Sequence, residues 1–423
     1  MLIEFTVKNF RSIREAQTLS LVKGKSNEFQ ATHSFQPPSP GALPLLRSCA
    51  IYGPNAAGKS NFIKGLGVMR SFVVESATAK QLGDEIPVTP FLFDDQDAKC
   101  PTDFEIVFIN EGVRYQYGFS ATVERVWDEW LLAYPKGRPQ RWFRRVYDAD
   151  TETYNWEMGS GLAGKKHLWQ ESTRANALFV STAVQLNSEQ LKPVYDWFRE
   201  KLRITNIRGW SPAVTASLYS EIQFKSDINE FLRAADLEIQ DVNINTKKFD
   251  SGDLPDDMPD VLKLELISEL KGAEVFDIKT IHQKNGGGTC QLEFDEESDG
   301  TQKLFSFAGP WLDSLANGYV LVIDELHDNF HPAIVRFLVS LFHNTEKNPE
   351  NAQLVFTTHE TSILSQDVFR RDQIWFCEKD QYQATSLYSL SDFSVRKKHE
   401  NLERSYLSGR YGALPFIRNL KTG

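Results

Sequence analysis

The sequence is poor in the features that would place it in a membrane or outside the cell. No apolar run approaches the length that a helix needs to cross a bilayer, and the first residues lack the basic region of a signal peptide. The four cysteines are scattered, with no Cys-x-x-Cys pair, which is typical of small buried side chains in a reducing compartment. We expect a cytoplasmic protein with no membrane partner.

The sequence has no excess of positive charge, since 47 lysines and arginines stand against 57 acidic residues. The formal net charge is −10, which argues against a surface that binds nucleic acid indiscriminately. The clearest local exception is Lys136–Arg145, where cations alternate with two aromatic residues. Two interpretations stay open for this stretch: a solvated basic strand, which is the commoner case for a run of charge, or a contact with DNA.

Internal repeats and sustained heptads are absent as well. Hydrophobic residues make up 41% of the 423 positions, a content typical of folded globular proteins. A chain of this length exceeds one ordinary hydrophobic core. We therefore expect two or more lobes and no coiled coil.

The most specific motif is the segment Gly53-Pro-Asn-Ala-Ala-Gly-Lys-Ser60, which follows an apolar stretch at residues 49–52. It matches G-x-x-x-x-G-K-[ST] at every fixed position, the pattern of a phosphate-binding P-loop between a strand and a helix. The loop predicts a nucleoside triphosphate with Mg²⁺ as ligand. Its predicted phosphate-binding residues are Gly53, Pro54, Asn55, Ala56, Ala57, Gly58, Lys59 and Ser60.

A second buried-type strand, residues 319–323, ends in Asp324 and Glu325. A strand that delivers an acid at its carboxyl end is what a site for Mg²⁺ and a nucleotide needs. We expect Asp324 to hold the Mg²⁺ shell and the Ser60 hydroxyl to be a direct ligand. Glu325 would polarise the attacking water, which favours hydrolysis over binding alone.

A third apolar strand, residues 354–358, ends at His359. A lone histidine is usually structural, but one at a strand tip, after the two acids in the chain, is better explained as a sensor of the γ-phosphate. Between the two acids and this histidine, residues 326–332 would form a turn that contacts a second copy of the chain. Pro332 suits the first turn of the helix expected at 333–342.

Ser298 and Gly300 precede a helix expected at 302–315. Backbone N–H groups, a hydroxyl and the positive end of a helix dipole can bind a γ-phosphate there. Because the P-loop already cradles the phosphates from one side, Ser298 and Gly300 would most naturally serve the nucleotide of a second subunit. A plain helix cap explains the same residues equally well, so both interpretations stay open.

Along the chain the motifs follow the order P-loop, Ser298 and Gly300, the two acids, the turn and His359. In this order they resemble the motifs of ABC-type ATPase heads of the SMC/RecF/OLD group. More narrowly, the chain is similar to compact prokaryotic phage-defence ATPases of the RloA or AriA kind, often described as AAA-family proteins. The narrower likeness lies in residues 9–12, 297–301, 372–376 with Lys379, and 409–412 near Pro415. The resemblance covers residues 1–119 and 290–423.

The resemblance implies an α/β fold, with the mixed β-sheet and flanking helices of a P-loop NTPase. It implies ATP and Mg²⁺ as cofactors, an ATP-sandwiched homodimer or larger homo-oligomer, and Arg11 and Asn61 as further nucleotide contacts. The chain departs from the group's pattern at Asp299, where transporter-type signatures have glycine. No glutamine is evident for the Mg²⁺-sensing loop, and Gln81 and Gln96 stay alternatives.

The long interval between Lys59 and Asp324 predicts an insertion. We expect an N-terminal ATPase lobe at 1–125, an inserted α+β or helical subdomain at 126–285, and a C-terminal ATPase lobe at 286–423. Too few residues follow His359 for the Toprim nuclease domain of OLD-type relatives.

The leading functional hypothesis is an ATPase that senses or scaffolds in an antiphage defence system and controls a separate effector such as a nuclease. The alternative is a DNA-binding repair or recombination ATPase of the SMC/RecF type, with residues 136–145 as its support. A nuclease hidden in the insertion lacks any spacing that nominates a metal site. A transporter motor is disfavoured by the long insertion.

Overall fold

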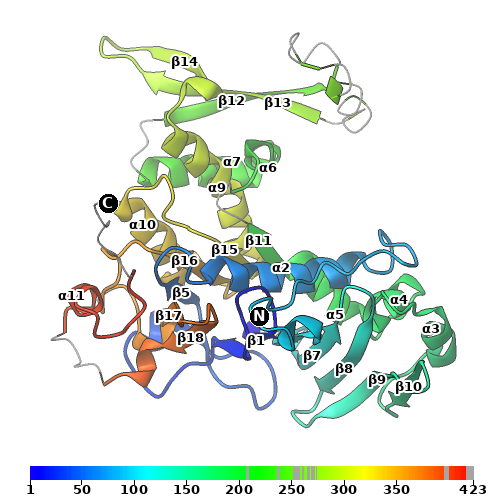
Figure 1. Ribbon diagram of the computed structural model, residues 1–423. Helices are drawn as coiled ribbons and strands as arrows, with labels where there is room; N and C mark the ends of the chain where they lie inside the picture. Colours follow the sequence, from blue (N-terminus) through cyan, green and yellow to red (C-terminus); the bar gives the residue numbers. More distant parts are fainter. Residues whose placement is uncertain are drawn as a thin grey trace, which may run out of the picture. The chain divides into compact units, whose positions relative to one another are not determined.

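The computed structural model describes residues 1–205, 209–235, 239–250, 258–259, 262–263, 267, 272, 274–394 and 400–415. The chain forms two compact units (Figure 1). The first combines Met1–Ile207 with Leu315–Gly423, and the second is Arg208–Ser314. An α/β fold with a central parallel sheet is therefore built from both ends of the sequence.

The parallel sheet of the first unit contains the three strands expected before the P-loop, the acids and His359. Its order is β11 (Leu202–Thr205), β15 (Val320–Ile323), β16 (Gln353–Thr358), β5 (Ser48–Tyr52), β17 (Ile374–Lys379) and β18 (Thr385–Ser389). All neighbours are parallel except β17 and β18. Every residue of β5, β15 and β16 is buried, as expected for parallel strands covered on both faces. The carboxyl ends of these strands therefore meet at one edge.

A seven-stranded antiparallel sheet forms the other layer of this unit. Its order is β10 (Thr153–Met158), β9 (Gln140–Asp148), β8 (Val126–Tyr134), β7 (Val113–Ala121), β6 (Thr102–Asn110), β1 (Leu2–Lys8) and β2 (Gln17–Ser20). Strands β6 and β7 form a hairpin, and Glu111 and Gly112 take positive φ in its turn. Alternate residues of β6 are buried, so one face of the sheet packs on the core.

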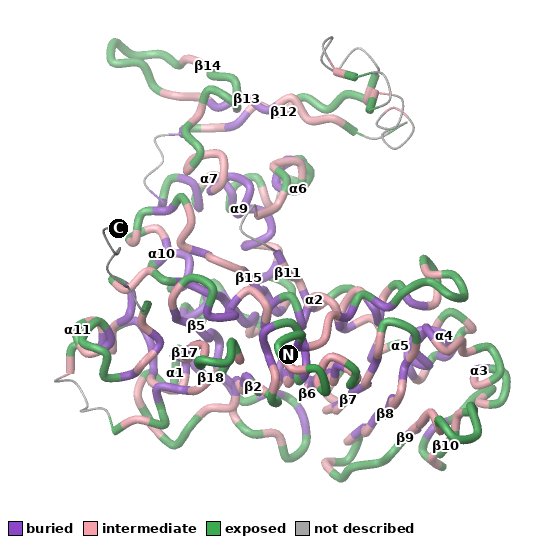
Figure 2. The backbone as a smooth tube through the Cα atoms, in the orientation of Figure 1, coloured by how far each residue is buried: buried purple, intermediate pink, exposed green. Residues whose placement is uncertain are grey.

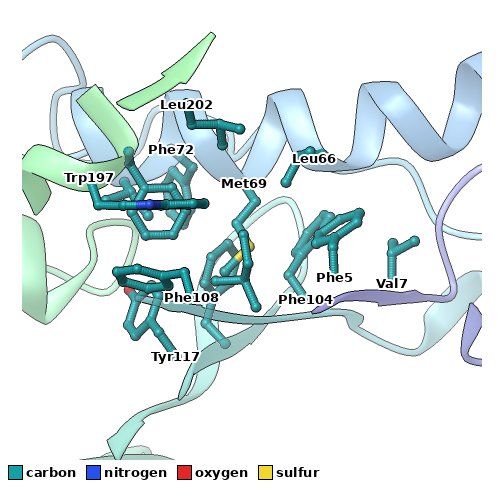
Figure 3. Packing of buried hydrophobic residues seen from close by; sticks show 14 of the residues in the cluster. Phe5, Val7, Leu66, Met69, Phe72, Phe104, Phe108, Tyr117, Trp197 and Leu202 are labelled. Carbon is teal, nitrogen blue, oxygen red and sulfur yellow. The ribbon is translucent and has the colours of Figure 1, made fainter. Parts of the chain in front are cut away.

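Helix α2 (Lys59–Glu75) packs between the two sheets, and its apolar residues belong to one cluster with both. Figure 3 shows Leu66, Met69 and Phe72 of α2 pointing toward the aromatic side chains of the antiparallel sheet. Phe72 meets Phe119 edge to face at 5.5 Å between ring centroids. The helix that starts at the P-loop lysine is thus fixed by the main hydrophobic core, which holds the loop in a defined place.

Short elements complete the first unit. They are α1 (Gln30–His33), β3 (Ser34–Phe35), β4 (Leu45–Leu46), α3 (Lys166–Ser172), α4 (Phe179–Gln185), α5 (Lys192–Asp196), a π-turn at Trp197–Lys201, α10 (Pro332–His343), α11 (Leu402–Leu407) and single 3₁₀ turns. Figure 2 shows buried backbone along β5 and β15 and a more exposed edge at β10. None of the helices within the described ranges combines the length and apolar character that a membrane crossing requires.

The second unit is a small α+β body. It contains α6 (Pro212–Tyr219), α7 (Ile222–Ala234), β12 (Ile239–Lys248), β13 (Glu274–Gln283), β14 (Thr289–Glu293) and the start of α9 (Asp299–Asn317). The three strands form one antiparallel sheet with β13 in the middle. The chain segment 126–207, which we expected inside the insertion, groups with the first unit. The three-part division at 125 and 285 stays a prediction.

The basic stretch Lys136–Arg145 lies on β9 and the turn before it, and each of its last three arginines has an acidic partner. Arg141 pairs with Glu157 at 2.6 Å, and Arg144 pairs with Asp128 at 2.8 Å. Arg145 is fully buried against Glu129 at 2.9 Å. These three cations are therefore already neutralised within the protein.

Candidate nucleotide-binding site

The P-loop is shaped by glycines at places where a side chain could not fit. A Cβ at Gly53 would lie 2.2 Å from the carbonyl oxygen of Cys377, and one at Gly58 would lie 2.1 Å from Oγ1 of Thr385. Gly58 also takes φ 108°, a conformation that side-chain-bearing residues rarely adopt. The loop thus packs closely against the β17–β18 hairpin while its open side stays available.

Lys59 begins α2 directly after this loop. Its buried ammonium donates to the carbonyl oxygens of Gly53 at 2.7 Å and Pro54 at 3.0 Å. Burial lowers the pKa of Lys59, while Glu325 and Asp324 oppose that effect through their negative charge. A buried lysine held only by neutral carbonyls is well placed to exchange them for the oxygens of a phosphate.

The two acids after β15 are organised by a threonine of the neighbouring strand. The hydroxyl of Thr357 donates to Oδ1 of Asp324 at 2.6 Å and accepts from the backbone N–H of Glu325 at 2.8 Å. Glu325 adopts φ 56°, which is unusual for a residue with a side chain. Thr357 therefore fixes both the carboxylate of Asp324 and the turn that carries Glu325.

His359 lies at the end of β16, where it meets a second histidine. The Nε2 atoms of His327 and His359 are 3.0 Å apart, and Nδ1 of His327 lies 3.1 Å from Oγ1 of Thr358. Burial, followed by the neighbouring His359, lowers the pKa of His327 to about 4. His327 is therefore neutral near pH 7, and one of the two facing nitrogens carries the shared proton.

These residues surround a cavity of about 370 Å³. The residues that line it are Asn55, Ala56, Ala57, Gly58, Lys59, Ser60, Asn61, Glu325, His359 and Lys379. Most of the predicted site is thus brought together by the P-loop and the carboxyl ends of β15, β16 and β17. A neighbouring cavity of about 780 Å³ includes Gly53 and Pro54.

Some predicted residues lie elsewhere. Arg11 is exposed, its N–H donates to the carbonyl oxygen of Thr89, and it is not among the lining residues of either cavity. Asp324 is also outside the lining set and contacts the site through Thr357. Gln81 and Gln96, the two alternatives for a Mg²⁺-sensing residue, are exposed and line neither cavity.

Ser298 and Gly300 belong to the second unit. The Ser298 hydroxyl accepts from the backbone N–H of Thr301 at 3.2 Å, so the side chain caps the start of α9. The helix-cap interpretation is therefore present in the structure. The cap satisfies one backbone N–H group at the start of α9, and the remaining ones have no partner from within the helix. The role of Ser298 toward a nucleotide stays a prediction.

Sequence reasoning missed three residues of this region: Thr357, His327 and Lys379 as a lining residue. Thr357 lies two positions before His359 and His327 lies two positions after Glu325, but a hydroxyl or imidazole near a motif gives no signal of its own. Ser12 is a further case, since its Oγ accepts from Nδ2 of Asn61 at 2.8 Å and lies 2.8 Å from Oγ1 of Thr385. Only the pairing of distant strands shows these contacts.

Two oxygen donors suit a magnesium ion, Ser60 in the cavity lining and Asp324 just outside it. The Ser60 hydroxyl and the Asp324 carboxylate are hard oxygen donors, and Mg²⁺ is usually held by one or two such groups together with phosphates and water. No cluster of three or more histidine, cysteine or acidic side chains occurs among the residues with described positions. Ser60 and Asp324 would hold such an ion together with the phosphate oxygens of a nucleotide.

The sequence matches the family described as "AAA domain, putative AbiEii toxin, Type IV TA system" over residues 49–365. No curated protein matches it. The chain is similar in structure to the SMC head domain from Thermotoga maritima, with 13% identity and a TM-score of 0.40. That alignment covers 93% of this chain and 99% of the SMC head domain. The alignment with the recombination mediator protein RecF covers 92% of this chain and 98% of the RecF chain, with 13% identity and a TM-score of 0.36. Both scores are below 0.5, so neither likeness supports a functional inference.

Proposed function

The chain belongs to this family of AAA domains and is an ATPase, and from that premise we propose that it is an ATP-gated switch. In this proposal two copies close on sandwiched ATP, hydrolysis reopens them, and the cycle controls a separate effector in a prokaryotic defence system. The observation that carries the proposal is the cavity in which Lys59, Glu325 and His359 face one P-loop. The description of the family, which names a putative toxin of a type IV toxin–antitoxin system, supports the defence role.

Each lining residue has a role that follows from its chemistry. Lys59 and the N–H groups of the loop bind the β- and γ-phosphates. Glu325 orients the attacking water, and His359 contacts the γ-phosphate. Ser60 and Asp324 would hold Mg²⁺, which neutralises charge that develops on the phosphate oxygens.

The dimer in this proposal rests on Ser298. Its hydroxyl and the free N–H groups at the start of α9 offer an anion site, and a second copy's γ-phosphate is the anion we assign to it. The half-site on the P-loop would then be complete only when two chains meet. Because α9 caps itself through Ser298, a substitution there has to keep the cap if it is to test the dimer alone.

We expect Glu325→Gln to reduce ATP hydrolysis by at least about 100-fold, because the variant retains the shape of the side chain but loses the base. With ATP bound and not hydrolysed, the variant should accumulate as a dimer, which light scattering after size exclusion measures. Glu346→Gln is a matched control, since Glu346 is an exposed acid after α10. Hydrolysis by Glu325→Gln at the native rate would show that Glu325 has another role.

The double variant Glu325→Gln, Ser298→Asp tests the dimer contact. Aspartate caps a helix as well as serine does, so α9 should stay intact, but its charge repels a γ-phosphate. The double variant should bind ATP and remain a monomer. If the double variant formed a dimer as stable as that of Glu325→Gln alone, Ser298 would not be part of the dimer interface.

The structure weakens the support that the basic stretch gives to the DNA-repair alternative, because three of its five cations have acidic partners. Arg141, Arg144 and Arg145 are all ion-paired within the first unit. Breaking these pairs to bind phosphate would leave three carboxylates without a cationic partner.

A further inference from the structure

Lys379 lies where the two cavities on the P-loop meet. Five residues line both cavities: Asn55, Ala56, Ala57, His359 and Lys379. Lys379 is the only one of these with a permanent positive charge at neutral pH. It is the last residue of β17, so it lies at the same sheet edge as the P-loop, Glu325 and His359.

The backbone that carries Lys379 is held firmly against the P-loop. Strand β17 pairs in parallel with β5, in the register Phe376 to Tyr52. The next residue, Cys377, donates from its thiol to the carbonyl oxygen of Ala57 at 3.4 Å, and burial raises its pKa to about 12, so the thiol stays protonated. Thr385, paired opposite Lys379 on β18, donates to the same carbonyl oxygen at 2.9 Å. The position of Lys379 relative to the loop is therefore defined by three separate contacts.

The charge of Lys379 is not neutralised by its acidic neighbours in the chain. Glu378 accepts from the backbone N–H of Ala413 at 2.8 Å. Asp380 accepts from the N–H groups of Tyr382 and Ala384, both at 2.8 Å. Lys379 is a half-buried residue, and within the described ranges its ammonium makes no hydrogen bond and no ion pair. A cation that is partly removed from water next to a phosphate loop favours an anionic ligand.

We propose that Lys379 binds the terminal phosphate of the nucleotide and so distinguishes a triphosphate from a diphosphate. The inference rests on the proposed nucleotide site and adds a second cation to it. Lys59 follows the loop and contacts its first carbonyl oxygens, whereas Lys379 reaches the loop from β17, on the side shared with His359. The two lysines bracket the loop, and the terminal phosphate is the part of ATP that ADP lacks.

The test is calorimetric titration of the full chain with ATPγS and, separately, with ADP. A charged hydrogen bond contributes about 1.5–3 kcal/mol, so Lys379→Gln should weaken ATPγS binding by about 10- to 150-fold while ADP binding changes by less than about 3-fold. Lys379→Arg, which retains the charge, should recover most of the loss. Gln383→Ala is a matched control, since Gln383 lines only the larger cavity.

The outcomes separate this inference from the proposed function. Equal weakening of ATPγS and ADP, or no weakening of either, would overturn the role of Lys379 and leave the ATPase site standing. If the unsubstituted chain bound neither nucleotide, the proposed function itself would fail. A thermal melt of each variant shows whether folding is retained, and a folded Lys379→Arg that binds like Lys379→Gln would also count against the inference.

Discussion

Two groups of cations in the first unit differ in whether they have acidic partners. Along β9, Arg141, Arg144 and Arg145 each have a carboxylate partner. At the P-loop, Lys59 contacts only backbone carbonyl oxygens, and Lys379 makes no ion pair within the described residues. The denser run of charge is thus the less available one. A partly buried cation without an acidic partner is therefore a better candidate for binding an anion than a dense run of paired cations.

The buried pair of the first group has a structural function. The Glu129 carboxylate accepts from the N–H groups of Phe179 at 2.8 Å and Val180 at 3.2 Å, and from the hydroxyl of Tyr117 at 2.9 Å. Arg145 balances its charge and donates to the carbonyl oxygen of Ala177. The pair therefore joins β8 and β9 to the start of α4, and its removal affects folding rather than ligand binding.

The largest expected effect on stability follows from breaking that pair. Arg145→Met should destabilise the protein by about 3–5 kcal/mol, because it leaves the buried Glu129 carboxylate without a counter-charge. The comparison is Lys59→Met at the nucleotide site, which should abolish hydrolysis and cost less than about 1 kcal/mol of stability, since no buried acid loses its partner. Urea unfolding measures the first quantity and phosphate release the second.

A double variant makes this contrast sharper. Glu129→Gln added to Arg145→Met removes the unbalanced charge while its amide oxygen still accepts from the α4 backbone. It should recover part of the lost stability. If Arg145→Met alone unfolded at the same urea concentration as the unsubstituted chain, the pair would not have the structural role assigned to it.

An intermediate effect is expected from basic side chains that the fold keeps neutral. His33 and His343 stack at 3.6 Å between ring centroids. Burial lowers the pKa of His33 to about 4 and that of His343 well below its usual value. The unfolded chain therefore binds more protons below about pH 6.5. Stability should be constant above that pH and fall as the pH drops toward 4, by about 2 kcal/mol for His33 between pH 6.5 and 5.

His33→Phe retains the ring stack and removes one titrating group. Its stability should depend less steeply on pH over this window, as thermal melts at several pH values would show. ATP hydrolysis is the contrasting measurement, because neither histidine lines the nucleotide cavity. An unchanged pH slope in His33→Phe would mean that other groups cause the acid instability.

The sequence was sufficient to predict the local strand ends that meet at the cavity. The P-loop, the acids after β15 and the histidine after β16 each combine an apolar strand with a polar end, and parallel strands bring such ends to one edge. What could not be predicted depends on pairing between distant segments. Strand register and burial determine the hydrogen bond from Thr357 to Asp324 and the ion pair of Arg145 with Glu129. They also determine where Lys379 lies relative to the P-loop. The continuation of the first unit through residue 207 is likewise a property of sheet order.

The smallest expected effect comes from the exposed members of the β9 group. Arg141 and Glu157 are 53% and 61% exposed, and Arg144 and Asp128 are 40% and 26% exposed, so each pair contributes at most about 1 kcal/mol. Arg141→Gln and Arg144→Gln together should leave ATP hydrolysis unchanged, with or without duplex DNA, at low and at moderate salt. A protein that used these arginines for DNA would lose affinity and show a weaker dependence on salt. A loss of DNA-stimulated hydrolysis in this variant would mean that paired cations still bind phosphate, and would remove the distinction between the two groups.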